Sequence, residues 1–158
     1  MKLHKLIATA FGSGYSPLAP GTAGSIVGIG MFFLVNYLLT YWGFAQMAIL
    51  LFDVVLISMA FFWGTCSIKK VHTIWENDAP KIVIDEVVGV WIAALALPLR
   101  WEYYLAALLL FRFFDIVKPL FIKRIDAIDG HWSVMLDDVV AGVYSVIVLH
   151  CILLFISF

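Results

Sequence analysis

The chain has 158 residues, is 64% hydrophobic and 13% charged, and has a mean hydropathy of +1.03. Soluble domains have only ~45–50% apolar residues, so this composition predicts an integral membrane protein. A formal net charge of −1, without a tract rich in Lys or Arg, argues against nucleic acid as a partner. We therefore expect one domain, residues 1–158, built as an all-α bundle of about four to five transmembrane or re-entrant helices.

The N-terminal part combines a short helix with a glycine-rich loop. Leu3–Phe11 predicts a helix that Gly12 ends, and the stretch Gly12–Ser25, GSGYSPLAPGTAGS, predicts irregular backbone. Such backbone is not tolerated against lipid, so the loop is expected to lie at the interface or to line a cavity. Thr22 or Ser25 is able to cap the next helix and direct its first N–H groups at the loop, as in an anion site. A simple turn with glycines for tight packing is an equally open interpretation.

Two long apolar runs follow this loop. Ser25–Tyr41 predicts a helix that, at ~1.5 Å per residue, barely crosses a ~30 Å hydrocarbon core and is open to a re-entrant interpretation. Met47–Ile68 predicts a full-length span that contains one acid, Asp53. Because Asp53 lies far along the chain from the other acids, we expect it to be capped or to snorkel toward the outer leaflet. Lys69 and Lys70 then mark the exit from the membrane.

Two adjacent carboxylates, Asp85 and Glu86, interrupt the next apolar run, Ile82–Leu99, which we expect to be a helix. A polar connection, Val71–Pro80, precedes it, and Pro80 breaks any helix there. At the centre of a bilayer each carboxylate would cost roughly 2.5–3.5 kcal/mol on insertion scales. A bound cation, nearby Arg or Lys side chains, or a position at the membrane surface must offset that cost.

Three charged residues occur at every third position of the next predicted helix, which begins at Tyr103 and ends near Pro119. Positions three apart share one helical face, so Arg112 is predicted to neighbour Asp115, and Asp115 to neighbour Lys118.

The last predicted helix, Val134–Phe158, follows a polar segment, Phe121–Ser133, and carries Asp137 and Asp138 in its first turns. All of these runs fit a helical period, and the sequence shows no alternating strands of barrel length. The sequence therefore predicts an all-α class.

The basic residues are distributed unevenly on this map. Of the ten Lys and Arg residues, only Arg100 falls on one side, and the positive-inside rule makes the other side cytoplasmic. The same map places both acidic pairs, Asp115 and the glycine-rich loop at the cytoplasmic face. The basic residues assigned to that face are Lys2, Lys5, Lys69, Lys70, Lys81, Arg112, Lys118, Lys123 and Arg124.

The carboxylates expected at this face outnumber the cations beside them, which favours a divalent metal. Carboxylate oxygens without organised Cys or His ligands suit a hard ion, and Mg²⁺ fits best if a substrate supplies phosphate oxygens. Neighbouring helical residues point about 100° apart, so one acid of each pair is expected to face the metal. Gly89 and Gly142 lie one turn after the acidic pairs and leave space for close helix packing.

An alternative interpretation is that the acids form structural ion pairs with Arg112, Lys118 and Lys81.

Three spacing patterns argue against other phosphate chemistries. Cys66 is not followed by Arg at position 72, and the four histidines form no pair flanked by Arg. The D-x-x-D-G run Asp126–Gly130 opens a CDP-alcohol phosphotransferase signature that fails at every later position.

Four stretches, GSGYSPLAPGTAGS, IVIDEVVGVWIA, FRFFDIVKP and MLDDVVAG, together resemble the phosphatidylglycerophosphatase A family over nearly the whole chain. The resemblance implies a magnesium-dependent membrane phosphatase that converts phosphatidylglycerophosphate to phosphatidylglycerol and phosphate at the cytoplasmic side of the bacterial membrane. One departure is at residues 130–133, GHWS, where the family has a Gly-Gly-aromatic-Gly run.

With this resemblance, the predicted mechanism is metal-assisted hydrolysis of a phosphomonoester. The predicted catalytic residues are the five acids. Of these, Asp115 either orients Arg112 and Lys118 or serves as an acid or base, and the i,i+3 spacing favours the orienting role. These two cations, with the N–H groups near Thr22 and Ser25, are predicted to bind the phosphate. A lipid-binding or transport protein without hydrolytic activity remains the alternative function. The predicted Mg²⁺ ligands are drawn from Asp85, Glu86, Asp137 and Asp138.

Overall fold

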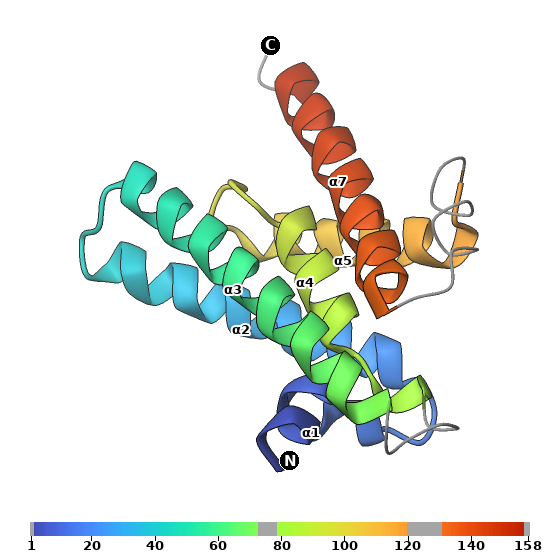
Figure 1. Ribbon diagram of the computed structural model, residues 1–158. Helices are drawn as coiled ribbons and strands as arrows, with labels where there is room; N and C mark the ends of the chain where they lie inside the picture. Colours follow the sequence, from blue (N-terminus) through green and yellow to red (C-terminus); the bar gives the residue numbers. More distant parts are fainter. Residues whose placement is uncertain (1, 73–78, 120–130, 157–158) are drawn as a thin grey trace.

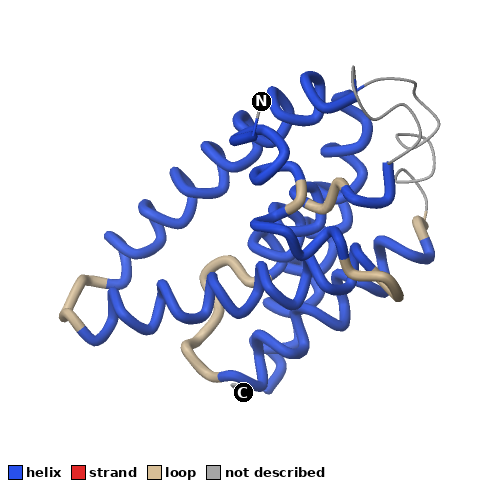
Figure 2. The backbone as a smooth tube through the Cα atoms, turned by 90° about the horizontal axis from the view of Figure 1, so that it is seen from below, coloured by secondary structure: helices blue, strands red, loops and turns tan. Residues whose placement is uncertain are grey.

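The computed structural model describes residues 2–72, 79–119 and 131–156, and this part of the chain contains helices and loops without strands (Figures 1 and 2). The all-α prediction is confirmed. The polar segment before the last helix, including Lys123, Arg124, Asp126 and Asp129, lies outside the described residues up to residue 130. In chain order the elements are α1 (Lys2–Ala8), η1 (Ala10–Tyr15), α2 (Pro20–Tyr41), α3 (Gln46–His72), η2 (Ala79–Lys81), α4 (Ile84–Ala93), α5 (Trp101–Val117) and α7 (His131–Ile156).

Among the described residues, α2, α3 and α7 are long and apolar enough to cross a membrane. The predicted start of the first of these helices at Ser25 was wrong, because α2 begins at Pro20. Proline suits a first helical position, where its missing N–H has no partner to lose and its φ is already helical. The added turn brings α2 to 22 residues, or about 33 Å, which is sufficient for a ~30 Å core.

Helix α4 is much shorter than the predicted Ile82–Leu99 helix. It has 10 residues and ends at Ala93, after which Ala96 takes a left-handed conformation with φ of 58°. At about 15 Å it is too short to cross a bilayer. Nearly all its side chains are buried, and it contacts α2, α3, α5 and α7, so its apolar run forms the core of the bundle (Figure 1).

The basic ends of several elements meet on one side of the bundle. His4 of α1 lies 3.2 Å from the hydroxyl of Ser67 near the end of α3, and the Lys70 ammonium lies 3.2 Å from the other His4 ring nitrogen. A Cβ on Gly14 of η1 would collide with the carbonyl oxygen of Lys81 in η2. Arg100, the one basic residue that the sequence places on the other side, lies just before α5 and pairs with Glu102 at 3.1 Å.

Of the two expectations for Asp53, capping and snorkelling toward the outer leaflet, the structure contradicts the second. Asp53 is buried between α2 and α3, and the Asn36 side-chain amide donates a hydrogen bond to its carboxylate at 3.2 Å. A polar partner on the neighbouring helix satisfies the acid where it stands, so it need not reach the headgroups.

Two glycines set the distance between α4 and α7, as the sequence predicts. A Cβ on Gly142 of α7 would collide with the Gly89 carbonyl oxygen and would lie 3.0 Å from the Cβ of Ile92. A Cβ on Gly89 would lie 2.8 Å from the backbone oxygen of Asp138 and would collide with the Phe111 ring. Both helices are therefore in backbone contact, a geometry that only small residues allow.

We expect Gly142→Leu to destabilise the protein by about 1–3 kcal/mol, because the new side chain would overpack the α4 contact. Thermal unfolding in detergent measures the effect. Val143→Leu is the matched control, since Val143 is exposed on the next position of the same helix. Equal unfolding temperatures for the two variants would contradict the close contact.

Candidate functional site

Three carboxylates from α4 and α7 form the centre of the candidate site. Oxygen atoms of Asp85, Glu86 and Asp138 all lie within 4.8 Å of one another. Asp85 and Glu86 occupy the first turn of α4, and Asp138 lies on α7. The glycine contact described above brings the Asp138 backbone against Gly89, one turn after Glu86, and so carries its side chain to the other two. Asp85 and Asp138 are buried, and Glu86 is half-buried.

The expectation that one acid of each pair would face this centre does not hold for Asp85 and Glu86. Both contribute an oxygen, and the Glu86 backbone N–H also donates to the Asp85 carboxylate at 3.1 Å. Adjacent helical positions diverge by about 100°, but the longer Glu side chain can turn back toward its neighbour. In the second pair, Asp138 joins the centre, whereas Asp137 forms an ion pair with the Lys118 ammonium at 2.8 Å.

Arg112 and Asp115 form the predicted i,i+3 pair on α5, with 2.7 Å between the guanidinium and the carboxylate. The carboxyl groups of Asp115 and Asp138 are within hydrogen-bonding reach, so this pair adjoins the three-carboxylate centre. The Arg112 Nε and the Glu86 Oε2 are buried and have no hydrogen-bond partner among the described residues. Such atoms are costly unless a bound group satisfies them.

Lys118 reaches the site by a different geometry from the predicted helical spacing. Helix α5 ends at Val117, and Lys118, the third residue after Asp115, is its C-cap in a left-handed conformation with φ of 45°. Lys118 therefore does not continue the helical face of Arg112 and Asp115. Its ammonium meets Asp137 on α7, and this ion pair links α5 to the start of α7.

The glycine-rich stretch approaches the site through backbone, and the predicted cap by Thr22 or Ser25 was wrong. Ala19 precedes α2 as its cap without a side-chain hydrogen bond. Ser25 is buried inside the helix, and its hydroxyl donates to the Gly21 carbonyl at 2.8 Å. A Cβ on Gly21 would collide with Glu86 Oε1 and lie 3.3 Å from Arg112 Nη1. The sequence prediction missed Gly21, although a glycine in a first helical turn is itself a signal of close approach.

Burial shifts the acids of α4 toward their protonated forms. It raises the pKa of Glu86. The pKa of Asp85 is raised well above its usual range, mainly by burial and also by repulsion from the Glu86 carboxylate. An opposite charge close to a carboxylate favours its ionised form. A cation bound among the three acids would therefore restore their negative charge.

The residues present fit a hard divalent cation. The donor set consists of carboxylate oxygens from three residues, and Glu86 Oε2 is a buried acceptor with no partner in the described part of the chain. Mg²⁺ prefers oxygen ligands and is usually held by one or two carboxylates together with substrate phosphates.

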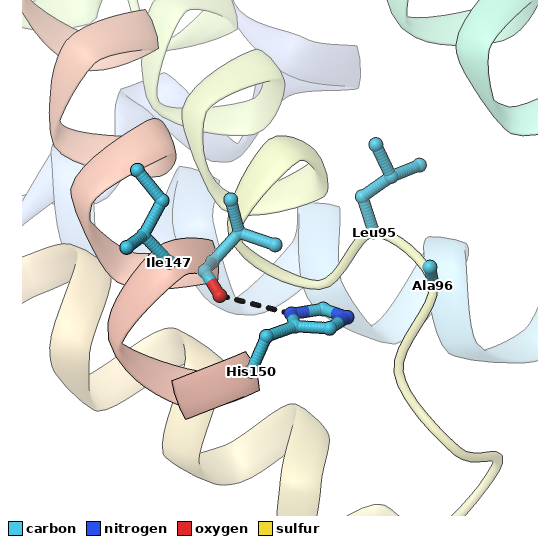
Figure 3. Close-up of a pocket in the computed structure, with 5 residues that line it drawn as sticks. Leu95, Ala96, Ile147 and His150 are labelled. Atoms are coloured by element: carbon cyan, nitrogen blue, oxygen red, sulfur yellow. Dashed lines mark hydrogen bonds between the residues drawn. The ribbon is translucent and has the colours of Figure 1, made fainter. Parts of the chain in front are cut away.

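A separate pocket of about 280 Å³ lies at the other end of α4, lined by Leu95, Ala96, Val146, Ile147 and His150 (Figure 3). The His150 Nδ1 donates to the Val146 carbonyl at 2.9 Å, and the rest of the lining is apolar. His150 lies twelve residues after Asp138 on α7, which is about 18 Å along a helix. This pocket therefore does not adjoin the carboxylates.

Comparison with known proteins agrees with these features. The family model described as phosphatidylglycerophosphatase A matches residues 6–153. A Bacteroides thetaiotaomicron protein, provisionally named a phosphatidylinositol-3-phosphatase, is 45% identical over 93% of this chain and 91% of its own length. The proteins named phosphatidylglycerophosphatase A from Haemophilus influenzae and Escherichia coli (strain K12) are 38% and 36% identical over 93% of this chain and over 86% and 81% of their own lengths.

No solved structure matches this chain. The family resemblance predicted from four sequence stretches is confirmed by a family model that covers nearly the entire chain. The chain therefore belongs to the phosphatidylglycerophosphatase A family, a family of phosphatases.

Proposed function

We propose that this protein is a Mg²⁺-dependent phosphatase that hydrolyses phosphatidylglycerophosphate to phosphatidylglycerol and phosphate at the cytoplasmic face of the bacterial inner membrane. The observation that carries the proposal is the cluster of Asp85, Glu86 and Asp138 beside the Arg112–Asp115 pair. Negative groups that could bind a metal and a guanidinium that could bind phosphate lie together in a chain of this family.

Asp85, Glu86 and Asp138 would hold the metal, and Asp137, the fourth acid predicted from the sequence, would remain paired with Lys118 beside it. When bound, Mg²⁺ supplies positive charge to the phosphate oxygens and lowers the pKa of water. Asp138 lies within hydrogen-bonding reach of Asp115, the partner of Arg112. The residues that would bind the metal therefore lie next to those that would bind the phosphate.

Arg112 would bind the non-bridging oxygens of the phosphate. Asp115 holds one guanidinium nitrogen at 2.7 Å, which fixes the side chain, while the buried Nε has no partner in the described residues and is able to donate to the substrate. The Lys118 ammonium would add positive charge from the α7 side. Fixed donors of this kind stabilise the charge of the transferring phosphoryl group without reorganising during the reaction.

The first turn of α2 would contact the phosphate or the glycerol. The N–H groups of Gly21 and Thr22 have no acceptor within the helix, and Gly21 lets this backbone lie against Glu86 and Arg112. Thr22 lies next to Gly21 and is half-buried, so its hydroxyl remains a candidate ligand. Ser25 is an unsuitable donor, because its hydroxyl already bonds to Gly21.

Two observations support the substrate and the orientation. The relatives from Haemophilus influenzae and Escherichia coli are named for phosphatidylglycerophosphate, and the excess of basic residues on the acid side follows the positive-inside pattern. The Bacteroides relative favours a second candidate substrate, a phosphatidylinositol phosphate. Phosphate release from both lipids, measured side by side on the purified protein, decides between them.

Removal of the metal or of its ligands should abolish hydrolysis. We expect chelation by EDTA, Glu86→Gln and Asp138→Asn each to lower Mg²⁺-dependent phosphate release by ~100-fold or more. EDTA removes the cation, and the amides of the two variants cannot replace the lost charge of its ligands. Asp53→Asn is the control, since it neutralises a buried acid on α3 outside the cluster and should retain most activity. Wild-type binding of the lipid without phosphate release would instead favour the lipid-binding or transport alternative.

Arg112→Lys should lower kcat/KM by about 10- to 100-fold, because an ammonium cannot bond to Asp115 and the phosphate with the geometry of a guanidinium. Steady-state phosphate release measures the loss. Arg100→Lys, which changes an exposed Arg paired with Glu102, should alter activity by less than about twofold. A similar effect of both variants would remove Arg112 from the site.

Gly21→Ala should reduce kcat/KM by ~10-fold or more, since the added methyl group would displace Glu86 or Arg112. Gly30→Ala is a matched control on the same helix, where an added Cβ meets nothing within 4 Å. It should leave activity unchanged. Full activity of Gly21→Ala would show that the α2 turn has no part in catalysis.

A further inference from the structure

An apolar groove of about 320 Å³ lies between α3, α4 and α7, a size within the ~300–1,000 Å³ range of small-molecule sites. Ser58 carries its only side-chain polar group, and that hydroxyl donates to the Val54 carbonyl of its own helix at 2.7 Å. The groove therefore offers no free polar side chain and suits a hydrocarbon ligand. Its lining residues are Ile57, Ser58, Phe61, Val88, Ile92, Leu136 and Val139.

The floor of the groove continues from the carboxylate site. Val88 and Ile92 follow Asp85 at three and seven positions, so all three share one face of α4. On the opposite wall, Val139 is the residue directly after Asp138. A molecule that lies in the groove would thus have one end next to the acids.

The other end of the groove opens at the exposed Ser58, between two helices that are candidate membrane spans. Two of its walls are α3 and α7, both of which meet the length and composition of membrane spans. The helices converge near Gly64, where an added Cβ would lie 3.1 Å from Ile84 and 3.2 Å from Met135. Figure 1 shows α3 and α7 diverging from the region where α7 begins.

We propose that this groove holds one acyl chain of the lipid whose phosphate is bound at the carboxylates. The inference rests on the proposed function and extends it to the apolar part of the substrate. An acyl chain that leaves the bilayer for an apolar groove gains little hydrophobic free energy, because lipid tails are as apolar as Leu side chains. Since affinity is not the gain, the role of the groove is alignment. It holds the lipid along α4, which places the phosphate at Asp85 and Asp138.

Ser58→Trp tests this role, because a large side chain there fills the groove from its lipid-facing rim. Met59→Trp is the matched control, since Met59 is the next residue on α3, is exposed and does not line the groove. The substrates are a long-chain phosphatidylglycerophosphate in mixed micelles and its dihexanoyl analogue. We expect Ser58→Trp to lower kcat/KM at least ~10-fold for the long-chain lipid and less than about twofold for the analogue.

Met59→Trp should leave both reactions within about twofold of the wild type. Equal activity of Ser58→Trp and Met59→Trp on the long-chain lipid would overturn the proposal. A loss of the same size on both substrates would also overturn it, because damage to the carboxylate site, and not to chain alignment, would then explain the effect.

A second measurement does not depend on hydrolysis. A phosphatidylglycerophosphate with a photoreactive acyl chain should label peptides that contain residues 57–61 or 136–139, and Ser58→Trp, but not Met59→Trp, should remove this labelling. Labelling confined to other peptides would overturn the acyl-chain site. Groove labelling in a protein that releases no phosphate would preserve the lipid site and reject the proposed hydrolysis.

Discussion

The backbone contact between α4 and α7 is the interaction on which the candidate site depends. Gly89 and Gly142 remove two side chains from this contact, and the Asp138 backbone then lies against Gly89. Asp138 meets Asp85 and Glu86 because the two helix axes are close. The packing of the bundle and the geometry of the carboxylates thus have a common cause.

The same contact brings three acids together inside an apolar core. Three carboxylates brought together by packing repel one another and are costly to bury. Arg112, Asp115, Lys118 and Asp137 form ion pairs around them, but the buried Glu86 Oε2 stays without a partner in the described residues. The bundle therefore buries negative charge that a bound cation would offset, at some cost to its own stability.

Helix α4 connects the polar and apolar parts of the proposed substrate site. Its first turn provides Asp85 and Glu86, its middle provides the glycine contact, and Val88 and Ile92 form the floor of the groove. One short buried helix thereby sets the direction in which a lipid would lie. The longer helices α3 and α7 supply the walls, and both are long and apolar enough to cross a membrane.

The sequence alone determined the helical class, the membrane character, the family and the set of charged residues, because composition, hydropathy and spaced motifs are local properties. It also predicted the Arg112–Asp115 pair, since helical periodicity fixes neighbours within a helix. The close approach at Gly89 and Gly142 was predicted because glycine leaves space for a neighbouring helix. Only the tertiary structure decided that α4 is a core helix and that Asp53 has Asn36 as its partner. It likewise assigned Asp138 to the cluster and Asp137 to Lys118, because contacts between helices depend on their rotation and distance, which no single helical period encodes.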